Sequence, residues 1–186
     1  RDELQDVKIR GGLVYRPIIH TIDCDPDRKH FQYYSWHLGG YERKMFTAGR
    51  LQFVPMLLRL LPEMYRDYLR VDVAVVPVSK PDEQGYCGLG LANFCWKTIM
   101  EKARTVIFEV NENMPCLQGV DGSHRVSLDE ADIIMEGQHG PLCTSSYRTP
   151  SEADLQIARN VVAEIPNGAT LSLGVGTIPF TIAQML

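Results

Sequence analysis

The stretch 71-VDVAVVPV-78 decides the fold class of this chain of 186 residues. It is a nearly continuous apolar run rich in β-branched side chains, and such a run is typical of a parallel strand covered on both faces. Residues 105–110 form a second run of the same kind. Segments with helical character lie between and beside such runs, so strands and helices alternate along the chain. The sequence therefore predicts an α/β fold, an open and mostly parallel sheet with flanking helices.

Local patterns predict further elements on both sides of that run. A helix that starts at Pro55 should end at Pro62, since proline cannot continue a helix, and a helix over 42–48 should end at Gly49. The remaining expectations, in chain order, are a strand at 7–14 broken near Gly11 and Gly12, a short apolar run at 18–22, an aromatic-rich segment at 30–40, a strand at 51–54, further helical turns at 63–69, a helix at 93–103 and a strand at 131–135.

A second domain is expected to open near the C-terminal end of the sequence. Residues 137–150 have the composition of a linker, and we divide the chain into a first domain, 1–146, and the start of a second, 147–186. Ser151 and Asp154 have the spacing of a capping box, which predicts a helix over 153–165.

The stretch 165-IPNGATLSLGVGTIP-179 reads as a turn, a buried strand at 169–173, a glycine loop and the start of a helix. Pro179 suits the first turn of that helix, because its fixed backbone angle is already helical. Gly174 and Gly176 let the backbone approach an anion closely, and the N–H groups at a helix start point toward such a ligand. The pattern predicts a ligand-binding loop.

Composition narrows the class of protein. The apolar fraction of 45% is that of a globular chain with a core. A formal net charge of −4 without a block of lysines and arginines gives no reason to expect nucleic-acid binding. No run of about 18 apolar residues occurs, so no membrane span is expected. The first residues, RDELQDVKIR, show neither an initiator Met nor a signal-peptide pattern, and we expect a chain truncated at both ends.

The five cysteines are odd in number and show no CxxC spacing. Disulfide frameworks use even counts, so we expect reduced thiols and a cytoplasmic protein. Metal ligation by Cys24, His30 and His37 is an alternative, but their irregular spacing favours ordinary core and surface roles, and we expect no metal.

Three loops follow the carboxyl ends of expected strands, where open α/β sheets bind their ligands. They begin after Val78, Val110 and Leu173. Each also has a simpler interpretation as a turn. Glu109 and Glu112 either form a carboxylate pair or are simply solvated, because strand alternation points them in different directions.

Motifs of nucleophilic and metal-dependent catalysis are not found in the sequence: it contains no GxSxG, HExxH or Walker A pattern. His124 is a candidate general base, although nothing nearby in the sequence marks a nucleophile. Composition and spacing alone lead to an α/β ligand-binding domain.

Taken together, four segments resemble the acetyl-CoA hydrolase/transferase family, and within it the 4-hydroxybutyrate, butyryl-CoA:acetate and itaconate CoA-transferases. They are 30-HFQYYSWHLGGYERKMFTAGRLQFVPMLLRLLPEMY-65, 71-VDVAVVPVSKPDEQGYCGLG-90, 109-EVNENMP-115 and 168-GATLSLGVGTIPFTIAQML-186. The resemblance covers nearly the whole chain. A lone GxGxxP would be weak, whereas PVSxPDExGYCxLG followed by EVNxNMP is specific.

The resemblance implies a two-domain α/β enzyme, longer than this chain and homo-oligomeric, that moves coenzyme A between an acyl-CoA and a short-chain carboxylate. It further implies an enzyme glutamyl-CoA thioester, formed on a glutamate of the second domain shortly beyond the GxGxxP segment. No residue of this chain matches that nucleophile, and Glu83, Glu109 and Glu112 are not candidates for it.

The resemblance also implies which residues contact the ligands. The coenzyme A contacts carried over from the family are Gly174, Val175, Gly176, Thr177 and Ile178. Two loops of the first domain, 79–86 and 111–115, are expected to wall the acyl or carboxylate pocket, with Ser79, Asp82, Gly85, Tyr86, Asn111, Asn113 and Met114 as its residues.

Some positions depart from the family pattern. Thr177 stands where members often have a second glycine, residues 117–125 fit less well, and the segment with Trp36 is unusually aromatic. These departures leave the acyl-group preference open. An acyl-CoA hydrolase of the same family and a non-catalytic ligand-binding module remain as alternatives. Dinucleotide binding is disfavoured, because GVGTIP lacks the third glycine of that fingerprint.

Overall fold

The computed structural model describes residues 4–12, 14, 19–91, 93–119, 121–144 and 148–186. The chain forms two compact units, Arg1–Cys143 and Thr144–Leu186. The domain boundary predicted between residues 146 and 147 lies outside the described residues. Among the described residues, no helix is long and apolar enough to cross a membrane.

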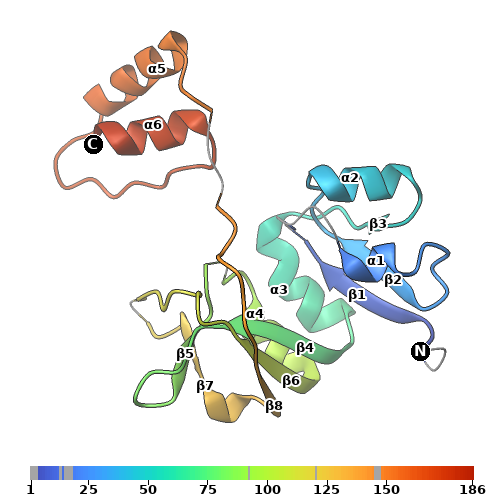
Figure 1. Cartoon of the computed structure of the whole chain (residues 1–186). Helices are drawn as coiled ribbons and strands as arrows, with labels where there is room; N and C mark the ends of the chain where they lie inside the picture. The colour runs from blue at the N-terminus through green and yellow to red at the C-terminus, as the bar shows by residue number, and fades with distance from the viewer. Residues whose placement is uncertain (1–3, 13, 15–18, 92, 120, 145–147) are drawn as a thin grey trace. The chain divides into compact units, whose positions relative to one another are not determined.

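Strands and helices alternate through the first unit (Figure 1). Its elements, in chain order, are β1 (Val7–Gly11), α1 (His20–Asp23), β2 (Phe31–Ser35), α2 (Gly40–Thr47), β3 (Gln52–Phe53), a 3-10 turn (Leu58–Leu60), α3 (Leu61–Glu63), a π-helical turn (Met64–Tyr68), β4 (Val71–Val78), β5 (Tyr86–Gly88), α4 (Trp96–Lys102), β6 (Ala103–Val110), β7 (Arg125–Ser127), a 3-10 turn (Leu128–Glu130) and β8 (Ile133–Glu136).

Two parallel sheets carry this unit. The first has the order β1-β2-β3 and the second the order β4-β6-β8. In the second sheet Val75 pairs with Ile107, which pairs with Ile133, and all neighbours run parallel. Parallel neighbours need a crossover between them, and α4 lies in the crossover from β4 to β6. The prediction of an α/β fold with parallel strands and flanking helices is confirmed.

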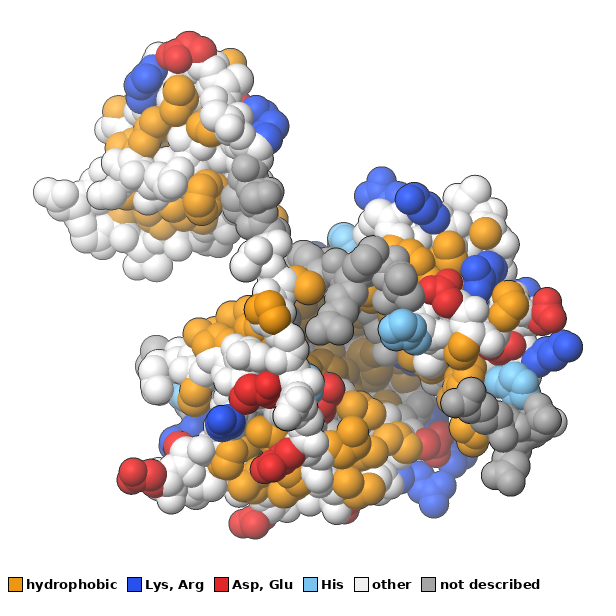
Figure 2. Space-filling view, viewed as in Figure 1, with side chains coloured by type: hydrophobic (Ala, Val, Ile, Leu, Met, Phe, Trp, Pro, Cys, Tyr) orange, Lys and Arg blue, Asp and Glu red, His pale blue; other side chains and the backbone are white. Residues whose placement is uncertain are grey.

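Within the first unit, strand β4 is buried on only one face. Val76 and Phe108 point into the core and have no exposed surface. The neighbouring Val75 points the other way and is 49% exposed, and the edge strand β8 is exposed on both faces. Hydrophobic side chains are visible at the surface of this part of the molecule (Figure 2). Within the first unit, the expectation that residues 71–78 would be covered on both faces is therefore wrong, because Val73 and Val75 stay exposed.

The helix predicted from Pro55 to Pro62 is also wrong. Residues 55–57 are not helical, and Pro62 lies in the first turn of α3, which continues into the π-helical turn. A proline in the first turn breaks no hydrogen bond, because the first N–H groups of a helix have no partner within the helix. Pro62 therefore helps to start a helix that the sequence pattern expected it to end.

Helix α2 ends as predicted. The chain leaves it through Gly49, whose φ of +70° is a conformation that glycine adopts without strain.

The second unit is a pair of helices, α5 (Glu152–Ala163) and α6 (Thr177–Met185), which pack against each other (Figure 1). The capping box at the start of α5 is confirmed: Asp154 N–H donates to Ser151 Oγ, and Ser151 N–H donates to a carboxylate oxygen of Asp154. The strand predicted at 169–173 does not form. Leu171 and Leu173 are exposed, and a strand needs a neighbouring strand to pair its backbone groups. No strand pairs with residues 169–173 in the described part of the chain.

Candidate functional site

The loop after β4 is fastened at its start by Ser79, which is 2% exposed. The Ser79 hydroxyl accepts a hydrogen bond from the backbone N–H of Gly88 (2.8 Å) and donates to the Lys80 carbonyl oxygen (2.9 Å). The Ser79 N–H donates to the Gly88 carbonyl oxygen (2.9 Å). These bonds join the end of β4 to β5, which pairs antiparallel with β7. The sequence predicted Ser79 as a pocket residue and did not predict β5. In the structure, Ser79 has a structural role, because it joins β4 to β5.

Asp82, Gly85 and Tyr86 form the tip of the same loop. Asp82 Oδ1 accepts from the N–H groups of Gln84 and Tyr86, both at 2.9 Å, and the Tyr86 carbonyl oxygen accepts from the Asp82 N–H. Gly85 has a φ of +80°, which this tight turn requires. The Arg125 guanidinium lies over the Tyr86 ring, 4.4 Å from the ring centroid. The Asp82 carboxylate therefore organises the turn.

The loop after β6 lies against the loop after β4. The Asn111 N–H donates to the Val78 carbonyl oxygen (2.9 Å), and the Met114 sulfur lies so near Gly90 that a Cβ there would be 2.8 Å from it. Within the loop, the Asn111 side-chain oxygen accepts from the Asn113 N–H (2.9 Å). The structure thus brings together two of the three predicted loops, at the carboxyl edge of the β4-β6-β8 sheet.

A histidine that the sequence analysis did not single out connects Glu109 and Glu112. His139 Nδ1 lies 2.9 Å from Glu112 Oε2, and Nε2 lies 3.2 Å from Glu109 Oε1. His139 falls in the predicted linker, and its side chain is 16% exposed. Since β8 ends next to β6, a histidine three residues beyond β8 reaches the loop after β6. That position after a third parallel strand was the signal that could have identified it.

The other residues considered from the sequence lie elsewhere. His124 packs against Gly119, and its buried Nδ1 has no hydrogen-bond partner among the described residues. His30 Nδ1 contacts the Leu4 carbonyl oxygen at 2.7 Å, and Cys24 Sγ contacts the Thr21 carbonyl oxygen. The described part of the chain contains no group of three or more His, Cys, Asp or Glu side chains arranged to hold a metal ion.

The predicted coenzyme A loop belongs to the second unit. Gly176 caps α6 with a φ of +150°, a conformation that side chains rarely adopt, and its carbonyl oxygen accepts from the Phe180 N–H (3.1 Å). Val175 just before it is 93% exposed. Thr177 and Ile178 form the first turn of α6, where N–H groups have no partner further back in the helix. These donors suit an anionic or carbonyl oxygen.

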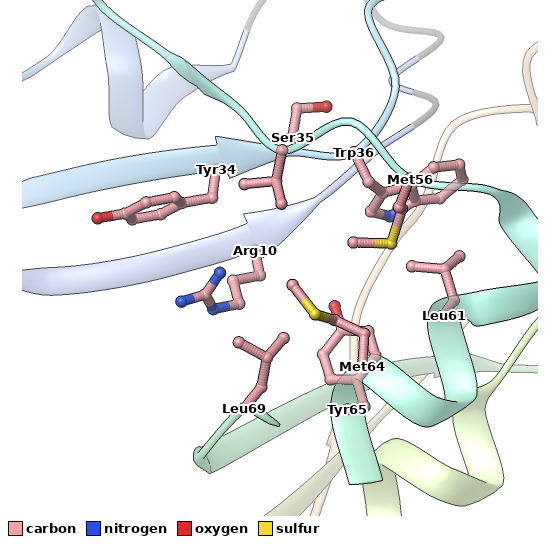
Figure 3. Close-up of a pocket in the computed structure, with 10 residues that line it drawn as sticks. Arg10, Tyr34, Ser35, Trp36, Met56, Leu61, Met64, Tyr65 and Leu69 are labelled. Atoms are coloured by element: carbon pink, nitrogen blue, oxygen red, sulfur yellow. The ribbon is translucent and has the colours of Figure 1, made fainter. Parts of the chain in front are cut away.

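A small cavity lies between the first sheet and the helical turns that precede β4 (Figure 3). Arg10 from β1 stacks over the Tyr34 ring of β2, 4.7 Å from its centroid, and Met64 and Leu69 face them. The cavity has a volume of about 20 Å³. A single water needs about 10–15 Å³ by this measure. This cavity therefore holds no acyl chain or carboxylic acid.

The parallel strands with flanking helices, and the two loops that meet at the carboxyl edge of one sheet, define the chain as an α/β domain. The chain belongs to the acetyl-CoA hydrolase/transferase family: residues 12–143 match the family described as "Acetyl-CoA hydrolase/transferase N-terminal domain".

Similarity to named proteins supports this assignment. The butyryl-CoA:acetate CoA-transferase of Anaerostipes caccae is 38% identical over 99% of this chain and 41% of its own length. The 4-hydroxybutyrate coenzyme A transferase of Clostridium kluyveri is 34% identical over 97% of this chain and 43% of its own length. The crystal structure of RipA from Yersinia pestis matches 97% of this chain and 43% of RipA with a TM-score of 0.84, at 24% identity, which shows a shared fold. The chain thus spans less than half the length of these relatives.

Proposed function

We propose that the protein containing this chain is a CoA-transferase that moves coenzyme A from an acyl-CoA to a short-chain carboxylate such as acetate, butyrate or 4-hydroxybutyrate. The observation that carries the proposal is 38% identity to a butyryl-CoA:acetate CoA-transferase over 99% of the chain. In the net reaction, RCO–SCoA and R′COO⁻ give RCOO⁻ and R′CO–SCoA. No oxidant, reductant or metal enters this balance. Location in the cytoplasm and assembly into a homo-oligomer stay predictions.

We propose a covalent route for the transfer. A glutamate carboxylate outside residues 1–186 attacks the thioester and releases CoA thiolate, leaving a mixed anhydride. The thiolate then attacks the glutamyl carbonyl, which expels the free acid and leaves a glutamyl-CoA thioester. The acceptor carboxylate is activated by the reverse of these steps. Each attack passes through a tetrahedral oxyanion, which hydrogen-bond donors stabilise.

Within the second unit, the proposed coenzyme A contacts are Gly174, Val175, Gly176, Thr177 and Ile178. Support for them comes from the glycine at the N-cap of α6 and from the unpaired N–H positions of a helical first turn, which suit a negatively charged oxygen.

Within the first unit, the proposed pocket residues divide into two groups. Ser79, Asp82, Gly85 and Asn111 hold their loops in place through the hydrogen bonds and the turn described above. Asn113 also holds its loop, because its side-chain amide donates to the His139 and Gly140 carbonyl oxygens. We therefore propose that these five residues shape the pocket and that Tyr86 and Met114 face the substrate.

The full-length protein tests this proposal when it is incubated with butyryl-CoA and isotopically labelled acetate. We expect labelled acetyl-CoA to form, and an enzyme adduct to be trapped by hydroxylamine or borohydride and located by mass spectrometry. Loss of butyryl-CoA that does not depend on acetate would instead identify an acyl-CoA hydrolase. Neither transfer nor an adduct would rule out the proposed function.

A further inference from the structure

His139 makes a set of polar contacts that ties two segments of the first unit together. Its backbone N–H donates to Glu112 Oε1 (2.8 Å), and its ring nitrogens face Glu112 Oε2 (2.9 Å) and Glu109 Oε1 (3.2 Å). We call the three residues the His139 clasp. Glu109 belongs to β6 and Glu112 to the loop after it, whereas His139 follows β8. The clasp therefore joins segments about 30 residues apart in the sequence.

The geometry favours the protonated form of the ring. A neutral imidazole has one N–H, whereas the imidazolium has two. Both ring nitrogens face carboxylate oxygens, so only the imidazolium donates at both positions. The hydrogen bonds to Glu112 and then Glu109 raise the pKa of His139, and these are the ionisable side chains that act on it among the described residues. The His139 N–H and ring lower the pKa of Glu112 to about 2.

The clasp also holds the loop that follows β6. Asn113 Nδ2 donates to the carbonyl oxygens of His139 (2.8 Å) and Gly140 (3.2 Å). The ring folds back over Gly137, where a Cβ would lie 3.3 Å from a ring carbon. Loss of the clasp would free one side of this loop, since its other side is held by the bond from the Asn111 N–H to the Val78 carbonyl oxygen.

We propose that His139 is a positioning residue for the carboxylate pocket: its imidazolium bridges Glu109 and Glu112 and holds Asn113 and Met114 in place for the acid substrate. The inference rests on the proposed function. Since both ring nitrogens are occupied, His139 takes no proton from substrate. With the imidazolium the clasp carries a net charge of −1, and without it −2, so the positive ring also reduces the repulsion of an anionic acid.

The test compares His139→Gln with wild type in the full-length protein, using butyryl-CoA and acetate. The matched control is His20→Gln, which replaces an exposed histidine on α1. We expect KM for acetate to rise about tenfold in His139→Gln, the size of effect typical of a lost hydrogen bond to a charged group. KM for butyryl-CoA should change less than twofold. In wild type, KM for acetate should rise as the pH passes the His139 pKa, and this rise should be absent from the variant.

Hydrogen–deuterium exchange provides a readout that does not depend on activity. We expect faster exchange across residues 111–114 and 137–140 in His139→Gln, with the rest of the first unit unchanged. Glu112→Gln should give the same exchange pattern and should move the rise in KM for acetate to lower pH, since it keeps the imidazole and removes its main partner.

Three outcomes would contradict either this inference or the proposed function on which it rests. Unchanged exchange in both variants would show that the clasp does not hold the loop. Faster exchange with an unchanged KM for acetate would show that the loop does not position the acid. Both results overturn the inference. Faster exchange in the variants, together with a wild-type protein that transfers no CoA, would overturn the proposed function and leave the clasp as a structural feature.

Discussion

The hydroxyl oxygen of Ser79 lies 2.8 Å from the backbone nitrogen of Gly88, and the backbone nitrogen of Ser79 lies 2.9 Å from the Gly88 carbonyl oxygen. Two residues nine positions apart thus bind each other through both backbone and side chain, and both are buried. The contact closes the loop between β4 and β5. The Ser79 hydroxyl is therefore one of the groups that hold this loop, together with the backbone bond and the Asp82 carboxylate.

Ser79→Ala should lower the free energy of unfolding by about 1–3 kcal/mol, because the buried N–H of Gly88 loses its side-chain acceptor. Ser172→Ala is the matched control: Ser172 is exposed, and its change should stay within about 0.5 kcal/mol. Denaturant unfolding of both variants measures the difference. Equal stability of the two variants would contradict a structural role for Ser79.

Substitutions of Val75 and Val76 test the one-sided burial of β4, because these neighbours on the strand have opposite exposure. Val76 has no exposed surface, whereas Val75 is 49% exposed. In the 186-residue chain, Val76→Ala should lower the free energy of unfolding by about 2–3 kcal/mol through lost burial and a cavity. Val75→Ala should change it by less than about 0.5 kcal/mol. A large loss from Val75→Ala would show that the second sheet face is covered in solution.

The His139 clasp should make stability depend on pH in two directions. The pKa of Glu112 is lowered from 4.5 to about 2, so its contribution is present in full above pH 4.5 and is lost as the pH falls toward 2. The pKa of His139 is raised above 6.5, so its contribution is present in full below pH 6.5 and is lost as the pH rises through the raised value. The stability difference between wild type and Glu112→Gln should therefore be largest between pH 4.5 and 6.5.

Denaturant unfolding of both proteins across this range measures the difference. Glu136→Gln at the end of β8 is the control, because Glu136 is exposed and lies outside the clasp, and its difference should be flat. A Glu112→Gln difference that is equally flat would mean that the clasp is not formed in solution.

Alanine substitutions at Gly174 and Gly176 distinguish the effect of backbone strain from the effect of losing a ligand contact. Gly176 has a φ of +150°, so Gly176→Ala should cost about 1–3 kcal/mol of stability. Among the residues that the structure describes, a Cβ at Gly174 would have only the Pro179 ring within 4 Å, at 3.8 Å, so Gly174→Ala should leave stability unchanged. If coenzyme A approaches this loop as proposed, both variants should raise KM for the acyl-CoA in the full-length protein. A Gly174→Ala enzyme with unaltered KM would argue against close contact at that position.

Local sequence patterns predicted much of the fold. The apolar run at 71–78 indicated a parallel strand, and the Ser151 and Asp154 spacing indicated the start of a helix. Both predictions depend on interactions between near neighbours in the sequence, such as side-chain alternation and capping. Pro62 and residues 169–173 were misread for a related reason: whether a proline starts or ends a helix, and whether an apolar run pairs as a strand, depends on what lies beside it in space.

The candidate site was only partly predictable. The sequence by itself determined the family, through an ordered set of motifs, and it located the loops after Val78 and Val110 at the ends of strands. Only the tertiary structure decided that these loops touch, that Ser79 and Asp82 shape their loop, and that His139 lies between Glu109 and Glu112. Those contacts join residues up to 30 positions apart, and they exist because β8 packs beside β6 with their carboxyl ends at one edge. Sheet order is a property of packing, and no local pattern in the sequence encodes it.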